Sequence, residues 1–402
     1  MDRQFKLFGD TYKASVFGVD VYATRDVGFT QYVLVENWQN YVKGQWIGRV
    51  ALLLGKGLMV SKGDLWKRQR KMIQPAFNPD SVATATELIS DVNDRLLSKW
   101  QLAASRNESV NVTRDVSGMS LEIVLRFLFG KDYDRVASHF DPLSADPARN
   151  PQFASSFRAL GRIILDVIEQ RRRASVKCGG ILDVLMQARD PHTGNSMPDA
   201  QLIDEVLTLI VAGHETTAST LNLCWYLISQ HPRVEEELSH EVHSLQALTN
   251  PIEFGDLPKF AYTRQILDET MRLYPAGWLL PRKALHDDHL GEYFVPAGTE
   301  IYISPYFIQR HPALWENPDA FNPDRFSPEN SRDRHRLATI PFSVGPRNCI
   351  GALFARVEMQ IHLMTIASRL RLRYTQSKPL ELDAGVNLRG KFDLIMYPEI
   401  RN

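Results

Sequence analysis

The sequence predicts a mainly helical protein with small β-sheets, organised as one domain over residues 1–402. Apolar residues at three- and four-residue spacing fill the middle of the chain, as in amphipathic helices. Short β-branched and aromatic runs, separated by Gly or Pro, lie near both ends. Because no linker-like segment divides them, we expect these elements to share one core.

The expected elements follow in chain order. Strands are expected at 11–17 and 19–24, and later at 282–285, 293–295 and 300–303. Helices are expected at 81–102, 111–129, 199–230, 262–274 and 351–370. A loop is expected at 138–150, which holds two Asp-Pro pairs. The β-rich portion then covers about 1–35, 280–305 and 372–402, and the helical portion about 64–275 and 351–370.

The helix at 199–230 is the longest element expected. Pro198 precedes it and His231-Pro232 ends it, and both positions are typical of helix boundaries. At 1.5 Å per residue it is roughly 45–50 Å long, enough to cross a whole domain.

Charge and cysteine content exclude several classes of protein. The 47 basic and 47 acidic residues balance, so the chain lacks the basic surplus of a nucleic-acid-binding domain. Three scattered cysteines are too few for a disulfide framework and fit a reducing compartment. No apolar run approaches the roughly 20 residues that span a bilayer. We therefore expect a cytoplasmic monomer without a transmembrane anchor.

Cys349 is the main candidate for chemistry. A lone cysteine is more often a buried structural thiol, but this one lies between two glycines that permit tight backbone turns. It also lies near the start of the helix at 351–370, whose positive end favours a thiolate, and close to Arg347. No second Cys or His has zinc-site spacing. A single axial thiolate is the ligand that some haem irons use.

The segment around this cysteine resembles the haem-binding loop of the cytochrome P-450 family, F-x-x-G-x-R-x-C-x-G. The matching residues are Phe342, Gly345, Arg347, Cys349 and Gly351. The resemblance implies a fold in which haem b (iron protoporphyrin IX) is buried between a long central helix and this loop. It also implies that Cys349 binds the iron, that Phe342 packs near the sulfur and that Arg347 pairs with a propionate.

A second motif is Glu269-Thr-Met-Arg272, whose charged residues share one helix face. Alone, such a pair is usually a solvated surface ion pair. In this sequence it resembles the family's E-x-x-R helix, and 321–326 resembles its partner segment. The resemblance implies that Arg325 joins Glu269 and Arg272 in a buried network that holds the cysteine loop.

A third motif, Ala212-Gly-His-Glu-Thr216, lies inside the long helix. Gly and hydroxyl residues weaken a helix, so the segment is either a locally weak buried stretch or a groove. It resembles the family's oxygen-binding signature. The resemblance implies that Ala212 lies over the iron, that Thr216 hydrogen-bonds dioxygen and that Glu215 relays protons. His214 is expected to be structural or exposed.

Two further segments resemble propionate-binding parts of the family. Trp66 and Arg70 match a W-x-x-x-R helix, and Arg282 follows the E-x-x-R helix closely. Read alone, 66–70 is an ordinary basic amphipathic turn.

The expected substrate pocket is apolar and includes Leu209, Ala276, Gly277, Trp278, Leu279 and Leu388, together with the stretch 46–59. Such a pocket favours a lipophilic substrate, such as a fatty acid, terpenoid, carotenoid or polyketide, which is hydroxylated or epoxidised. Arg49 and Arg389 are either anchors for a substrate carboxylate or simply exposed. The stretch 130–165 looks short for the two helices that roof the pocket in the family.

Electrons must come from another protein, because the chain has no room for a fused reductase and no G-x-G-x-x-G fingerprint. We expect a ferredoxin or flavodoxin with its reductase. Lys67, Arg68, Lys71 and Arg347 form either its docking patch or an ordinary solvated face.

Three functions remain open at this point. The first is a monooxygenase that uses dioxygen. The second is a peroxygenase or haem-thiolate isomerase, and the third is a haem-binding sensor or carrier. Neither of the latter needs the Glu215-Thr216 pair, so its presence favours the monooxygenase.

Overall fold

The computed structural model describes residues 1–16, 18–45, 54–140, 153–174, 177–246, 252–376 and 379–401, and the account below concerns these residues. Arg49, Trp46 and most of the predicted loop 138–150 lie outside them. Among the described residues, no helix has the length and apolarity to cross a membrane.

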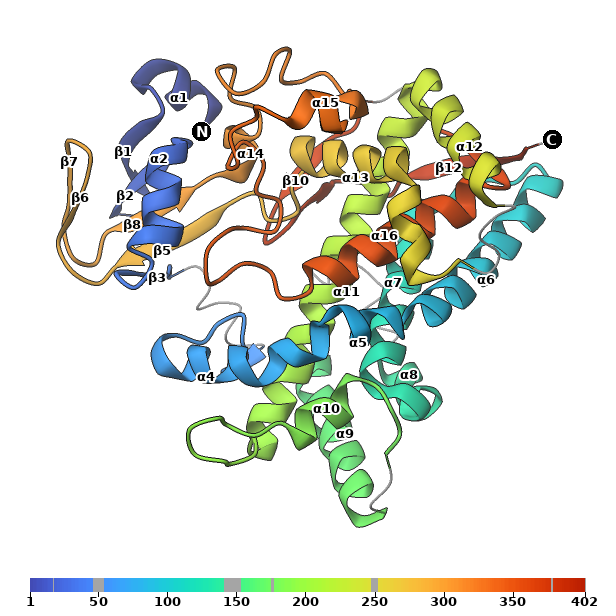
Figure 1. Ribbon diagram of the computed structural model, residues 1–402, viewed down its shortest axis with the longest axis horizontal. Helices are drawn as coiled ribbons and strands as arrows, with labels where there is room; N and C mark the ends of the chain where they lie inside the picture. Colours follow the sequence, from blue (N-terminus) through green and yellow to red (C-terminus); the bar gives the residue numbers. More distant parts are fainter. Residues whose placement is uncertain are drawn as a thin grey trace.

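The chain is mainly helical with small sheets, as predicted (Figure 1). The helices are α1 (Asp2–Phe8), α2 (Val27–Gln31), α4 (Gly63–Ile73), α5 (Pro79–Ala83), α6 (Thr86–Ser105), α7 (Val112–Phe129), α8 (Tyr133–Phe140), α9 (Phe153–Ala174), α10 (Ile181–Gln187), α11 (Asp199–Gln230), α12 (Pro232–Gln246), α13 (Ala261–Leu273), α14 (Pro305–Ile308), α15 (Pro328–Ser331) and α16 (Ala352–Ala367). The strands are β1 (Thr11–Val16), β2 (Val19–Thr24), β3 (Tyr41–Lys43), β4 (Val110–Asn111), β5 (Leu280–Ala284), β6 (Asp288–Leu290), β7 (Tyr293–Val295), β8 (Glu300–Ile303), β9 (Leu370–Arg373), β10 (Leu382–Ala384), β11 (Leu388–Gly390) and β12 (Ile395–Ile400).

Helix α11 has the bounds that the sequence predicts and runs through the helical part of the molecule (Figure 1). It packs against α7, α9, α13 and α16. Apolar side chains are buried on several of its faces, which fits a helix surrounded by others. One continuous apolar core joins these helices. Helix α11 is therefore held firmly in place and can position the side chains of a site.

A five-stranded sheet, in the order β1-β2-β8-β5-β3, forms a separate lobe beside the helices (Figure 1). Neighbouring strands are antiparallel except for β2 and β8, which are parallel. This lobe has apolar clusters of its own. The C-terminal strands do not join it, because β12 pairs with β4 and β9 and packs on α6.

Several local expectations were wrong. Residues 2–8, within the portion expected to be β-rich, form α1, with Phe5 buried against Tyr12. The helix expected at 81–102 is two helices, α5 and α6, and α8 includes 138–140 of the expected loop. The last helix ends at Ala367, and Leu370 begins β9.

A buried histidine ties three helices together. The Trp225 indole N–H of α11 donates to Nε2 of His362 at 2.8 Å, and His362 Nδ1 lies 2.7 Å from Oδ1 of Asn93 in α6. The indole can only donate, so the proton of this imidazole is on Nδ1 and is donated to Asn93. Burial lowers the pKa of His362 to about 3, which keeps the ring neutral.

We predict that His362→Gln lowers the free energy of unfolding at pH 7 by about 1–3 kcal/mol, since a buried partner is lost. The unfolded histidine gains a proton below its ordinary pKa of 6.5, whereas the native one stays neutral. Because of His362, the free energy of unfolding of the wild type therefore falls by about 1.4 kcal/mol per pH unit below pH 6.5. The difference in this free energy between the wild type and the variant narrows accordingly. Urea unfolding from pH 7 to 5 measures this, and a constant difference would contradict it.

Candidate active site

A cavity separates α11 from the loop that carries Cys349. Its volume is about 310 Å³, and its walls are mostly apolar. This lies at the lower end of the roughly 300–1,000 Å³ of an ordinary small-molecule pocket. The predicted site residues that line it are Leu209, Ala212, Thr216, Ala276, Gly277, Phe342, Arg347, Cys349 and Gly351.

Other predicted pocket residues lie behind the wall. Trp278 donates its indole N–H to Gly385 O at 3.0 Å, Leu279 packs in the core of the sheet lobe, and Leu388 is buried. None of the three lines the cavity, whereas their neighbours Leu280 and Asn387 do. Trp278 and Leu279 lie in the loop before β5, where the bond to Gly385 and the packing in the sheet lobe hold their side chains away from the cavity.

The cysteine loop is a compact turn whose thiol is exposed to the cavity. The Cys349 N–H donates to Phe342 O at 2.9 Å. Gly345 has a φ of 75°, and any side chain there would collide with the carbonyl oxygen of Leu34. Only glycine therefore allows the loop to lie this close to the sheet lobe.

The ionisation of Cys349 differs from the expectation of a ready thiolate. Protein surrounds the sulfur outside the cavity, and burial raises the pKa of its thiol. The Gly351 N–H and the Arg70 cation act in the opposite direction. Because a bound metal ion deprotonates a coordinating thiol, the thiolate is the form expected with a metal on the sulfur.

Arg70 of α4 holds the neighbour of this cysteine. Its guanidinium donates to Asn348 O at 2.8 Å and to Asn348 Oδ1 at 2.9 Å. Trp66, one turn earlier, is buried, and the Arg347 guanidinium lies over its ring at 4.1 Å. Helix α4 is thereby fixed to the cysteine loop.

Three cations, of which Arg282 is buried and Lys43 and Arg347 are partly buried, stand together without an acidic ion-pair partner among the described residues. Lys43 donates to Met59 O, Arg282 to Pro281 O at 3.0 Å, and Arg347 to Ser61 O at 3.3 Å. Lys43 and Arg282 are directly opposed on β3 and β5, an arrangement that like charges disfavour.

Burial lowers the pKa of all three cations, and repulsion by neighbouring cations adds to the shifts of Arg282 and Lys43. Burial lowers the pKa of Arg282 and of Arg347 to about 10, and Arg347 contributes to the shift of Arg282. Burial, Arg282 and Arg347 also lower the pKa of Lys43 well below its ordinary value. A buried charge needs a partner, so this corner fits an anionic group such as the propionates of a haem. The sequence analysis did not identify Lys43 as a site residue, because nothing in the pattern around it predicts its burial.

Across the cavity, two threonine hydroxyls of α11 donate to carbonyl oxygens one turn earlier in the helix. The Thr216 hydroxyl donates to Ala212 O at 2.7 Å, and the Thr217 hydroxyl donates to Gly213 O at 3.0 Å. Glu215 does not line the cavity but lies beside Asn387 and Arg389. His214 is buried, with Nε2 3.1 Å from the Ser117 hydroxyl, and burial lowers its pKa to about 4.

The protein groups around the cavity fit a haem. Among the described residues, no group of three or more His, Cys, Asp or Glu side chains could hold a metal ion by itself. Gly351 faces the cavity, and a Cβ added there would meet no protein atom within 4 Å. A large planar group can therefore lie against this backbone.

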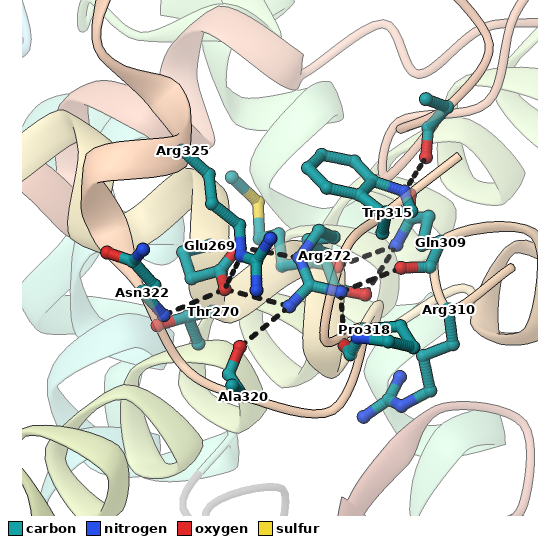
Figure 2. A network of polar contacts seen from close by, with 12 residues as sticks. Glu269, Thr270, Arg272, Gln309, Arg310, Trp315, Pro318, Ala320, Asn322 and Arg325 are labelled. Atoms are coloured by element: carbon teal, nitrogen blue, oxygen red, sulfur yellow. Dashed lines mark hydrogen bonds and ion pairs between the residues drawn. The ribbon is translucent and has the colours of Figure 1, made fainter. Parts of the chain in front are cut away.

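Glu269, Arg272 and Arg325 meet in one network (Figure 2). The Arg272 guanidinium donates to both Glu269 carboxylate oxygens at 2.6 and 2.8 Å, and both side chains are fully buried. Arg325 Nε lies 3.4 Å from the same carboxylate. Arg272 also donates to the carbonyl oxygens of Gln309, Pro318 and Ala320.

Gln309 extends this network to the cysteine loop. Its amide nitrogen donates to the carbonyl oxygens of Met271 and Arg272 at the end of α13 (Figure 2). Its amide oxygen accepts the Ile340 N–H at 2.6 Å, two residues before Phe342. Gln309 comes from a segment that no motif marks, so it was missed in the sequence.

We predict that Arg272→Lys lowers the free energy of unfolding by about 3–5 kcal/mol, because an ammonium cannot replace the planar fork inside the core. Arg373→Lys, at an ion pair whose side chains are about half exposed, is the matched control and should change it by less than about 1 kcal/mol. Urea unfolding measures both. An Arg272→Lys variant as stable as the wild type would contradict the prediction, and so would an Arg373→Lys variant as unstable as the Arg272→Lys variant.

Comparison with known proteins agrees with this geometry. The family model described as cytochrome P450 matches residues 5–163 and 140–394. The chain is 31% identical over 352 residues to the cyclooctat-9-en-7-ol 5-monooxygenase of Streptomyces melanosporofaciens, covering 82% of this chain and 76% of that protein. It is 27% identical over 412 residues to the protein LUTEIN DEFICIENT 5 of Arabidopsis thaliana, and the match covers 93% of this chain and 69% of that protein.

Solved structures show the same fold. The cytochrome P450 CYP102L1 superimposes with a TM-score of 0.85 at 22% identity, covering 99% of this chain and 93% of that chain. The haem domain of cytochrome P450DA superimposes with a TM-score of 0.87 at 23% identity, covering 100% of this chain and 90% of that chain. The chain therefore belongs to the cytochrome P450 family of haem-thiolate monooxygenases.

Proposed function

We propose that this protein holds haem b through Cys349 and inserts one atom of dioxygen into a lipophilic substrate. The observation that carries the proposal is the placement of the Cys349 thiol opposite Ala212 and Thr216 across one apolar cavity. Cations at the edge of this site supply partners for two propionates.

Each residue has a proposed task. Cys349 ligates the iron, Phe342 and Gly351 pack beside it, and Arg282 and Arg347 bind propionates. Arg70 and Trp66 act on the loop through Asn348 and Arg347, rather than through a free guanidinium. When bound, the haem activates dioxygen, and its thiolate ligand favours cleavage of the O–O bond.

Helix α11 is proposed to supply the protons that the reaction consumes. The reduction of dioxygen consumes protons, and a positioned hydroxyl and carboxyl group can supply them. We assign the hydroxyl to Thr216, whose Oγ1 now donates to Ala212 O and must turn from it to face the cavity. We assign the carboxyl to Glu215 on the adjacent position.

The substrate is proposed to be an isoprenoid or another large apolar molecule. The cavity wall is mostly apolar, which favours such a ligand. The name of one relative specifies cyclooctat-9-en-7-ol, and this compound is a rational first probe. Lauric acid and β-carotene represent the other two classes.

Electrons are proposed to come from a ferredoxin or flavodoxin that docks on α4. Lys67, Arg68 and Lys71 are exposed there, although Asp64 and Asp190 lie near Lys67 and Arg68. Arg347 lies inward over Trp66, so it does not belong to this surface patch.

Turnover with isotopically labelled dioxygen tests the proposed function. The haem-loaded protein, a surrogate ferredoxin and its reductase are supplied with the three probes and NADPH. A product that carries one labelled oxygen atom is expected. Products that form only with hydrogen peroxide, or no product at all, would favour the peroxygenase or the carrier instead.

We predict that Thr216→Ala lowers the product formed per NADPH consumed by roughly tenfold, because the hydroxyl no longer directs a proton to dioxygen. Ser229→Ala, whose hydroxyl donates to Tyr226 O in the same helix and does not line the cavity, is the control. Product and NADPH are quantified together. Full coupling in the Thr216 variant would remove its assigned role.

We predict that Lys67→Glu with Lys71→Glu slows reduction by the ferredoxin about tenfold at low ionic strength, since charge complementarity steers association. The difference should shrink as salt screens the charges. Lys391→Glu, on the β10–β11 hairpin, is the control. Stopped-flow reduction with equal rates for wild type and double variant would exclude this docking face.

A further inference from the structure

The β10–β11 hairpin brings a charged residue to the proposed proton donor. Asn387 Nδ2 lies 3.2 Å from one oxygen of the Glu215 carboxylate, and Arg389 Nη1 lies 3.5 Å from the other. Asn387 lines the cavity, whereas Glu215 and Arg389 lie behind its wall. The carboxylate is therefore held on the hairpin side of α11.

Arg389 is itself anchored on the hairpin. Its Nε and Nη2 atoms donate to Asp383 Oδ2 at 3.2 and 3.1 Å, and the two residues are paired across β10 and β11. Side-chain exposure along this chain is 40% at Asp383, 16% at Arg389 and 25% at Glu215. A chain of alternating charge thus leads from the partly exposed Asp383 to α11.

The hairpin also has a fixed place beside α11. The Leu388 N–H donates to Ala276 O at 3.0 Å, and the Ser219 hydroxyl of α11 donates to Leu388 O at 2.6 Å. These bonds hold the backbone next to Arg389, so the position of its guanidinium relative to Glu215 is set by the fold.

The contact of Arg389 with Glu215 is longer than its contacts with Asp383. At 3.5 Å it is longer than the 2.7–2.9 Å of a strong charge-assisted hydrogen bond. Arg389 keeps its two bonds to Asp383 if Glu215 leaves. The carboxylate can then move toward the cavity while the arginine stays in place.

We propose that Arg389 is a positioning residue for Glu215: from its anchor on Asp383 it keeps the carboxylate beside Thr216, where a proton taken from solvent is passed toward the cavity. The inference rests on the proton-donor role proposed above for Glu215. Without the guanidinium, Glu215 loses the partner of one carboxylate oxygen and is less precisely placed beside Thr216, so proton supply slows.

This assignment opposes the alternative that Arg389 anchors a substrate carboxylate. Two protein carboxylates already lie within 3.5 Å of its guanidinium. A third would have to displace one of them, and Arg389 does not line the cavity.

A double-mutant cycle tests the proposal on the haem-loaded protein with a surrogate ferredoxin and its reductase. The variants are Arg389→Gln, Glu215→Gln and their combination, with Arg389→Lys as the conservative change. Lys391→Gln breaks an exposed ion pair on the same hairpin and is the control. The readouts are the NADPH oxidation rate, its solvent deuterium isotope effect, and the affinity for lauric acid from the change in haem absorption.

We expect Arg389→Gln to slow NADPH oxidation on the order of tenfold and to raise its isotope effect, because proton delivery becomes limiting. Arg389→Lys should recover part of the rate, and Arg389→Gln should add nothing in the Glu215→Gln background. Lauric acid affinity and the Lys391 variant should match the wild type. Weaker lauric acid binding at an unchanged rate, or additive effects of the two substitutions, would overturn the proposal.

The cycle separates this inference from the function on which it rests. A slow Glu215→Gln variant beside an unaltered Arg389→Gln variant contradicts the role of Arg389 alone. A Glu215→Gln variant that behaves as wild type contradicts the proton role of Glu215, and the inference with it.

Discussion

The buried Arg272 guanidinium is the interaction on which the site depends. It joins α13 to the irregular chain at 309–320 through three carbonyl oxygens, and Glu269 balances its charge. Gln309 carries the connection to Ile340, where the cysteine loop begins. The loop lacks regular secondary structure, so these bonds, together with Arg70 and the close approach at Gly345, hold the thiol facing α11. A polar core outside the cavity thereby determines the geometry inside it.

Charge distribution supports the same site independently. Lys43 and Arg282 oppose each other across two strands, and Arg347 lies near both, with no acid beside them among the described residues. Such a corner is costly in the protein alone and favourable around an anion. By contrast, Glu215 and Arg389 form an ion pair of opposite charges behind the α11 wall. The three cations therefore fit an anionic cofactor, and the Glu215–Arg389 pair lies where proton supply is proposed.

How far the sequence predicts this molecule depends on the range of each signal. The bounds of α11 were predicted correctly because Pro198 and His231-Pro232 act locally. The end of the last helix was misplaced, because Leu370 is apolar enough for either element and its pairing with Ile400 decides. Contacts that depend on tertiary structure leave no local pattern in the sequence. The bonds of Gln309 and the burial of Lys43 depend on segments that are distant along the chain. The anchoring of Arg389 on Asp383 depends on the register of β10 and β11. Motifs located the site, and tertiary packing determined its wall.

The central claim is that Cys349 supplies the thiolate that binds a haem iron. The most direct measurement is the absorption spectrum of the reduced, haem-loaded protein with carbon monoxide. Cys178→Ser serves as the control, since Cys178 lies away from the cavity wall. The account predicts the red-shifted band of a thiolate-bound haem in wild type and control, and its loss in Cys349→Ser. A folded, haem-loaded wild type without that band, or a Cys349→Ser variant that keeps it, would contradict the account.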